Sequence, residues 1–167
     1  SFSEDLRRDL TDDAEALRKL LTRVGRWKPH QDAKLNRLHD LLTKDHQTEK
    51  VLVFTQFADT AEYLARELKA RGVTEIEAAT GQSDDPTELA WRFSPDSNYK
   101  HALKGTKDEL RVLIATDVLS EGQNLQDCAI VVNYDLPWAI IGLIQRAGRL
   151  DRIGQEAPQI ICYSFLP

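Results

Sequence analysis

Two arginines and a glycine are predicted to lie on one face of a helix in the last third of the chain. Gln145, Gly148, Arg149 and Arg152 fall at positions i, i+3, i+4 and i+7, so they share that face. Glycine costs about 1 kcal/mol relative to alanine inside a helix, so Gly148 indicates that something approaches the backbone closely there. Two guanidiniums beside a bare backbone suit a polyphosphate. A solvated basic helix face is the alternative that these residues alone leave open.

A second group of candidate ligands follows a strand that is predicted to end at Thr116. Asp117, Gly122 and Asn124 come directly after it. Ligands of parallel α/β sheets bind at the carboxyl ends of the strands, and short polar side chains there can hold a ribose hydroxyl or a phosphate. The same residue types favour turns, so this loop by itself would be interpreted as a turn.

The elements that must position these residues alternate between strands and helices from residue 49 onward. Short apolar runs predict strands over 51–54, 74–79, 111–116, 129–134 and 159–165, and amphipathic runs predict helices over 58–70, 88–93 and from residue 137. Asp84 and Asp85 before Pro86 indicate a helix N-terminus rather than a metal site. This alternation predicts an α/β fold of three layers, with a mainly parallel sheet covered on both faces.

Two further segments have a composition of their own. Residues 1–48 are charged and helical, with leucines at helical spacing and Gly25 as a stop, and we expect this lead-in segment to pack on the α/β body at 49–167. The polar stretch 94–109 predicts a mobile surface loop. Contact of its basic side chains with DNA is the alternative; these are Lys100, His101, Lys104 and Lys107.

Composition limits the class of protein. The chain has 167 residues and a net charge of −5, which argues against a protein that coats DNA generally. No apolar run approaches the ~20 residues of a membrane helix. Cys128 and Cys162 have no metal or redox spacing, so buried free thiols in a reducing cytoplasm are expected. The absence of methionine and the serine at position 1 indicate a fragment of a longer protein.

The order and spacing of these segments resemble the C-terminal RecA-like lobe of superfamily-two helicases, and especially the SWI/SNF-type and RapA-like branch. Residues 51–57 look like motif IV, with Gln56 typical of that branch, and Thr80-Gly81 looks like the conserved turn that follows. Residues 115–125 look like motif V, and residues 145–155 look like motif VI. The resemblance covers roughly residues 34–167.

The resemblance implies a role for each matching residue. ATP with Mg²⁺ binds between two RecA-like lobes, and the N-terminal lobe of the same polypeptide carries the P-loop and the carboxylates that hold the metal. Arg149 and Arg152 would be arginine fingers, and Gln145 would orient water or phosphate. Gly122, Asn124, Asp117 and Gly148 would approach the nucleotide. Thr116, Gly81 and Gln56 would contact the nucleic acid. The sequence contains neither a P-loop nor an Asp-Glu-x-His box, so this chain alone is expected to be inactive.

Three functions remain open at this point. The favoured one is the C-terminal motor lobe of an ATP-dependent translocase or helicase on duplex DNA, because Gln56 and the segment Arg152-Ile153-Gly154-Gln155 are typical of the SWI/SNF-type branch. The second keeps the fold and replaces DNA by RNA. The third is a non-catalytic α/β module that binds an anionic partner through the same arginines.

Overall fold

The computed structural model describes residues 2–25, 28–116, 119, 124–135 and 159–166. It divides into two compact units, residues 1–32 and residues 33–167. The expected lead-in segment at 1–48 therefore contributes its last third, residues 33–48, to the larger unit. Within the described residues, no helix is long and apolar enough to span a membrane.

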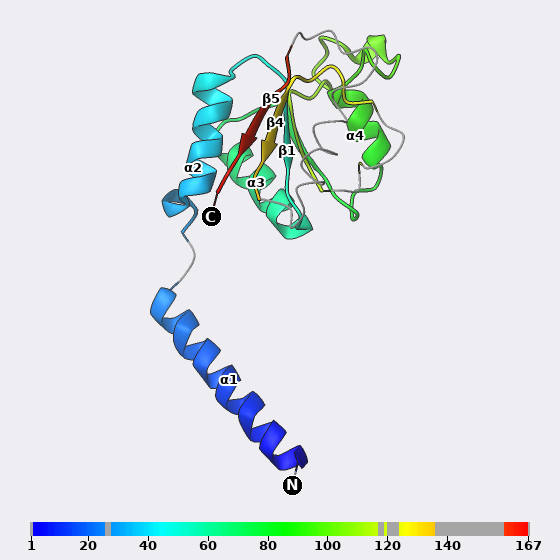
Figure 1. The fold of residues 1–167 in the computed structure, drawn as a ribbon. Helices are drawn as coiled ribbons and strands as arrows, with labels where there is room; N and C mark the ends of the chain where they lie inside the picture. The colour runs from blue at the N-terminus through cyan, green and yellow to red at the C-terminus, as the bar shows by residue number, and fades with distance from the viewer. Residues whose placement is uncertain (1, 26–27, 117–118, 120–123, 136–158, 167) are drawn as a thin grey trace. The chain divides into compact units, whose positions relative to one another are not determined.

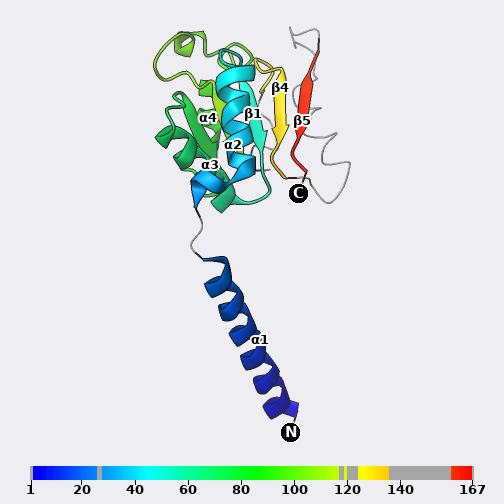
Figure 2. The same ribbon diagram turned by 90° about the vertical axis from the view of Figure 1, so that its left-hand side faces the viewer.

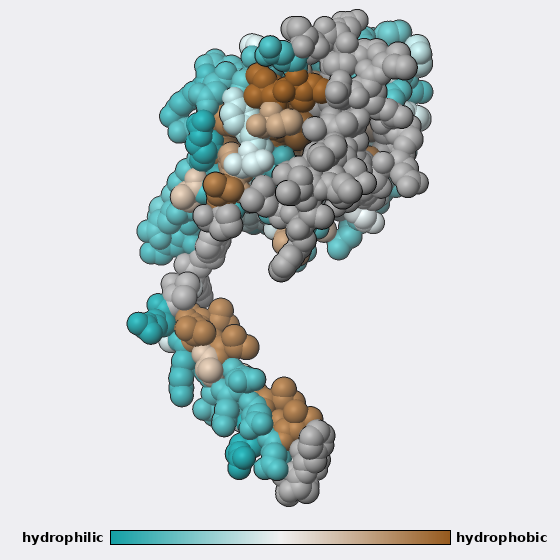
Figure 3. All heavy atoms as spheres, viewed as in Figure 1, coloured by the Kyte–Doolittle hydropathy of each residue, from teal (hydrophilic) through white to brown (hydrophobic). Residues whose placement is uncertain are grey.

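The smaller unit is built around one amphipathic helix, α1 (Phe2–Val24), followed by a short 3-10 turn, η1 (Pro29–Gln31). Gly25 ends α1 with a φ of +76°, the left-handed conformation that glycine adopts at the end of a helix. Leucines recur along one side of α1, and each is more than half exposed within this structure: Leu6, Leu10, Leu17, Leu20 and Leu21. They form the brown patches on α1 in Figure 3. The prediction that this helix packs on the α/β body stays a prediction.

The larger unit contains a five-stranded sheet in which every pairing is parallel (Figure 1). The strands are β1 (Val51–Phe54), β2 (Ile76–Ala79), β3 (Val112–Ala115), β4 (Ile130–Asn133) and β5 (Ile161–Ser164), in the order β2-β3-β1-β4-β5. Each strand is shorter by two or three residues than its apolar run predicts, except β1. The predicted α/β fold with a parallel sheet is confirmed.

Side chains on the strands alternate between two hydrophobic cores, one on each face of the sheet. On the first face, Val51 and Val53 pack with α2 (Ala33–Asp40), with the π-helical turn η2 (Leu41–Asp45) that continues it, and with α3 (Ala58–Ala70). On the second face, Leu52 and Phe54 pack with α4 (Pro86–Phe93). Figures 1 and 2 show α2 and α3 on one side of the sheet and α4 on the other. This is the expected three-layer arrangement. The helix α2 belongs to it through Leu35 and Leu38, and η2 through Leu41 and Leu42.

Two local signals in the sequence are confirmed. The side chain of Asp85 accepts a hydrogen bond from the backbone N–H of Glu88 at 3.0 Å, so the acidic pair before Pro86 caps a helix as expected. Gly72 follows α3 with a φ of +89°, which ends that helix where the sequence predicts.

The two cysteines differ in environment. Cys128 is buried as expected, its Sγ lies 3.1 Å from the carbonyl oxygens of Lys50 and Ile130, and burial raises the pKa of its thiol to about 12. The expectation of a buried Cys162 is wrong, because that residue is exposed on β5, an edge strand paired with β4 alone among the described strands.

This difference predicts unequal reactivity toward thiol reagents. At pH 8 a disulfide reagent should modify Cys162 faster than Cys128 by a factor on the order of a hundred or more, because only the thiolate reacts and Cys128 must lose its proton in a buried site. Kinetics of thiol titration on the folded chain measure this. The Cys162→Ser variant is the control, and a fast-reacting thiol that survives in it would contradict the assignment.

Candidate nucleotide and nucleic-acid site

At the carboxyl edge of the sheet, the residue that follows each of β1, β3 and β4 donates a backbone hydrogen bond to the neighbouring strand. The N–H groups of Thr55 and Thr116 donate to the carbonyls of Ala115 and Ala79, at 3.0 and 3.1 Å. The N–H of Tyr134 donates in the same way to Phe54, at 2.9 Å. The first residues beyond three neighbouring strands, β3, β1 and β4, therefore lie along one edge, where the ligands of such sheets bind.

Asp135 ties the loop after β1 to the loop after β4. Its carboxylate accepts the hydroxyl hydrogen of Thr55 at 2.6 Å and the backbone N–H of Gln56 at 3.0 and 3.1 Å. Thr55 is fully buried and Gln56 is partly exposed. Gln56, the residue expected to contact nucleic acid, thus has its backbone fixed at the edge by a charge-assisted hydrogen bond.

The turn after β2 is fixed by Thr80 and Ser83, and it presents Gly81 to open space. Ser83 Oγ accepts the N–H of Thr80 at 2.9 Å, and the carbonyl of Thr80 accepts the N–H of Ser83 at 3.1 Å. Gly81 is exposed, and an added Cβ would meet no atom within 4 Å among the described residues. The backbone at Gly81 is therefore open to a close approach, as expected of a residue that contacts a phosphate backbone.

Thr116 and Asn124 mark the two ends of the expected motif V loop. Thr116 is buried at the carboxyl end of β3, next to the end of β2. Asn124 is partly exposed and uses its side chain internally, since its Nδ2 donates to the carbonyl of Ser97 at 3.0 Å. The remaining expected site residues, namely Asp117, Gly122, Gln145, Gly148, Arg149 and Arg152, lie outside the described residues.

Two acidic residues were missing from the expected site: Asp135, which organises the carboxyl edge, and Asp127, which binds the segment after α4. Asp135 directly follows the apolar run of β4, and Asp127 directly precedes it. An acidic residue next to a strand was the available signal, but its partners are 79 to 80 residues away for Asp135 and 30 to 31 residues away for Asp127. Spacing along the sequence does not reveal such pairs.

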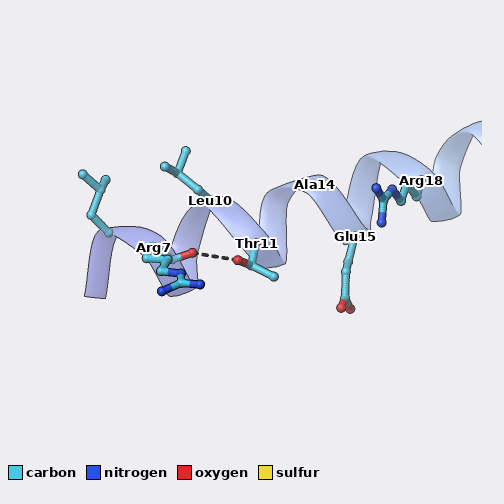
Figure 4. Close-up of a pocket in the computed structure, with 7 residues that line it drawn as sticks. Arg7, Leu10, Thr11, Ala14, Glu15 and Arg18 are labelled. Carbon is cyan, nitrogen blue, oxygen red and sulfur yellow. Dashed lines mark hydrogen bonds between the residues drawn. The ribbon is translucent and has the colours of Figure 1, made fainter. Parts of the chain in front are cut away.

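Metal ions and small molecules are the other ligands that the described residues could bind. The described residues contain no group of three His, Cys, Asp or Glu side chains that could hold a metal ion. A hollow on α1 is lined by Leu6, Arg7, Leu10, Thr11, Ala14, Glu15 and Arg18 (Figure 4). All of these belong to a single helix, so the hollow is a groove on the surface of α1 and lacks the converging polar groups of a ligand site.

Comparison with known proteins identifies the family. The model of the helicase conserved C-terminal domain matches residues 33–154, so the chain belongs to that family. The match begins at the first residue of the larger unit and leaves α1 outside.

Relatives and solved structures agree with this assignment. The chain is 32% identical to the uncharacterized ATP-dependent helicase YqhH of Bacillus subtilis over 86% of its length, and 32% identical to the ATP-dependent RNA helicase RhlB of Shewanella amazonensis over 79%. It spans 23% and 27% of those proteins.

Two solved structures show the same fold. The C-terminal part of the Fun30 ATPase domain superimposes with a TM-score of 0.62 at 18% identity, over 93% of this chain and 48% of that one. The C-terminal domain of the DEAD-box protein Dbp5 superimposes with a TM-score of 0.54 at 27% identity, over 80% of this chain and 69% of that one. The expected RecA-like fold is confirmed, whereas the SWI/SNF-type branch stays a prediction.

Proposed function

We propose that this chain is the C-terminal lobe of an ATP-dependent motor that acts on nucleic acid. The observation that carries the proposal is the carboxyl edge of the sheet, where the loops bearing Gln56, Gly81 and Thr116 end neighbouring strands in a helicase C-terminal domain. Open backbone at Gly81 and a fixed backbone at Gln56 suit a phosphate-lined ligand that runs along that edge.

The catalytic part of the proposal rests on the residues that match motifs V and VI. Arg149 and Arg152 would neutralise the charge that spreads over the γ-phosphoryl oxygens of ATP, and Gln145 would orient the attacking water. Gly148, Gly122 and Asp117 would lie close to the nucleotide. Bound Mg²⁺ supplies further charge neutralisation, and we assign its ligands to the N-terminal lobe.

The nucleic acid is proposed to be duplex DNA. Gln56 and the Arg152-Ile153-Gly154-Gln155 segment support this choice. RNA is the second candidate, because RhlB is an RNA helicase and Dbp5 is a DEAD-box protein. Phosphate contacts would serve either substrate, since they carry affinity without sequence information.

The proposal predicts that residues 1–167 do not turn over ATP by themselves, whereas the full-length protein does so when nucleic acid is added. Half of the nucleotide site is assigned to the other lobe, so the isolated chain lacks the groups that hold the β- and γ-phosphates. Phosphate release is measured for both proteins with duplex DNA, duplex RNA and single-stranded RNA. Stimulation by duplex DNA supports the first candidate, and stimulation confined to RNA supports the second. A full-length protein that none of the three stimulates would contradict the proposal.

A further inference from the structure

The segment between α4 and β3 contains a folded turn at its beginning. Ser94 and Pro95 are buried, and the backbone closes on itself because the N–H of Lys100 donates to the carbonyl of Pro95 at 2.7 Å. The side-chain Nδ2 of Asn98 donates to the carbonyl of Ser94, also at 2.7 Å. The first half of the segment predicted as a mobile surface loop is therefore folded into a hydrogen-bonded turn, and its mobility stays a prediction.

Asp127 binds this turn from the segment that leads into β4. Its carboxylate oxygens accept the backbone N–H groups of Asp96 and Ser97, both at 2.8 Å, and the hydroxyl of Ser97. A carboxylate that receives two consecutive backbone N–H groups forms charge-assisted hydrogen bonds, which are about twice as strong as neutral ones. The turn is thus anchored at one charged group.

Asn98 and Asn124 complete the attachment through reciprocal hydrogen bonds. Asn98 Nδ2 donates to the carbonyl of Asn124 at 2.7 Å, and Asn98 Oδ1 accepts the N–H of Asn124 at 3.4 Å. Asn124 Nδ2 donates in return to the carbonyl of Ser97 at 3.0 Å. The backbone of Asn124 and its amide nitrogen are therefore both used within the protein.

These contacts fix one end of the segment that matches motif V. Thr116 at the other end is fixed by its hydrogen bond to Ala79. Leu125 and Cys128, on either side of Asp127, are buried in the core that covers the α4 face of the sheet. A group that holds Asn124 thus fixes the point at which the described chain resumes after the motif V segment.

We infer that Asn98 and Asp127 are positioning residues that hold Asn124, and through it the end of the nucleotide-binding segment, in the geometry required for ATP. The inference rests on the proposed function. It changes the role of Asn124 from a direct nucleotide contact to an anchor, because its amide nitrogen already binds Ser97. We name the set Asn98, Asn124 and Asp127 the amide clamp.

The test uses the full-length protein with saturating nucleic acid and two variants of the amide clamp. Asn98→Asp removes the amide donor and keeps an acceptor oxygen, and Asp127→Ala removes the acceptor for Asp96 and Ser97. Both should raise the KM for ATP on the order of tenfold or more, with a smaller change in kcat. The reason is that a mutation far from the reacting atoms which shifts a binding group by about 1 Å can cost about a hundredfold in catalytic efficiency. A purely structural role would lower the apparent kcat by reducing the folded fraction and leave KM unchanged.

The matched control is Asp96→Asn. Asp96 lies on the same turn and pairs through its side chain with Lys104 and His101, while only its backbone N–H reaches Asp127. This variant should keep KM within about twofold of the wild type, since exposed ion pairs contribute little. Unchanged KM values for both clamp variants, or an equal rise in the control, would overturn the inference.

Amide hydrogen exchange on residues 1–167 separates failure of the inference from failure of the proposed function. The N–H groups of Ser97 and Asn124 should be protected in the wild type. Asp127→Ala should remove the protection of Ser97, and Asn98→Ala, which also removes the acceptor oxygen that Asn98→Asp keeps, should remove the protection of Asn124. Each exchange rate should rise by a factor of ten or more, the order expected for the loss of a charged or buried hydrogen bond. If the full-length protein hydrolyses no ATP but these changes occur, the function fails and the clamp stands. If the exchange rates do not change, the clamp fails whatever the ATPase shows.

Discussion

Replacing Arg149 or Arg152 by alanine in the full-length protein is expected to lower nucleic-acid-stimulated ATP turnover by about 10³- to 10⁵-fold, with a much smaller loss of ATP affinity. An arginine finger meets its partner oxygens mainly in the transition state, where negative charge has spread over the transferring group. Such a loss therefore falls on kcat rather than on ground-state binding. Steady-state ATPase kinetics with saturating nucleic acid, together with nucleotide binding by equilibrium titration, measure both quantities.

Two matched variants make this prediction specific. Arginine to lysine at either position should fail to restore turnover, because a compact ammonium cannot reproduce the planar fork of five donors. Arg146 is the neighbouring control, since it falls about 100° around the predicted helix from Gln145 and outside the shared face. Near-normal turnover in the Arg149 and Arg152 variants, with a large loss in Arg146→Ala, would show that the catalytic face has been assigned to the wrong side.

Hydrophobic patterning predicted the architecture because the central strands β1, β3 and β4 are buried on both faces. Val51 to Phe54 form a continuous apolar run, and alternate residues of that run enter different cores. Pattern alone could not predict where the edge strand is open, so the exposure of Cys162 was missed. Burial depends on what packs against a strand, which the strand's own sequence does not contain.

Residues of the candidate site could be proposed from the sequence only where they lie next to a predicted strand. Thr116 directly follows a strand, Gln56 and Gly81 are each the second residue after one, and the structure brings their loops to one edge. Asp135 and Asp127 could not be identified from the sequence, because their carboxylates accept hydrogen bonds from backbone N–H groups that are distant in sequence. Backbone donors look alike at every position of a sequence, so a carboxylate that binds them leaves no compositional signal.

Asp135 gives the largest expected effect on the stability of the lobe itself. Asp135→Ala should lower the free energy of unfolding of residues 1–167 by about 2–4 kcal/mol, because it leaves the hydroxyl of Thr55 and the N–H of Gln56 without their acceptor, at about 1–3 kcal/mol each. Asp135→Asn keeps one acceptor oxygen and should lose about half as much.

Thr55→Val tests whether the loss comes from this hydrogen bond. The variant removes the buried donor together with its demand for an acceptor, so it should cost only about 1 kcal/mol. Since Thr55 and Asp135 share one interaction, the double variant should be more stable than the sum of the two single losses predicts, by a coupling of about 0.5–3 kcal/mol. Urea unfolding of the four proteins measures the cycle. Additive losses of unfolding free energy, or a loss below about 0.5 kcal/mol for Asp135→Ala, would show that Asp135 does not organise the carboxyl edge. Another interaction would then have to fix the backbone of Gln56.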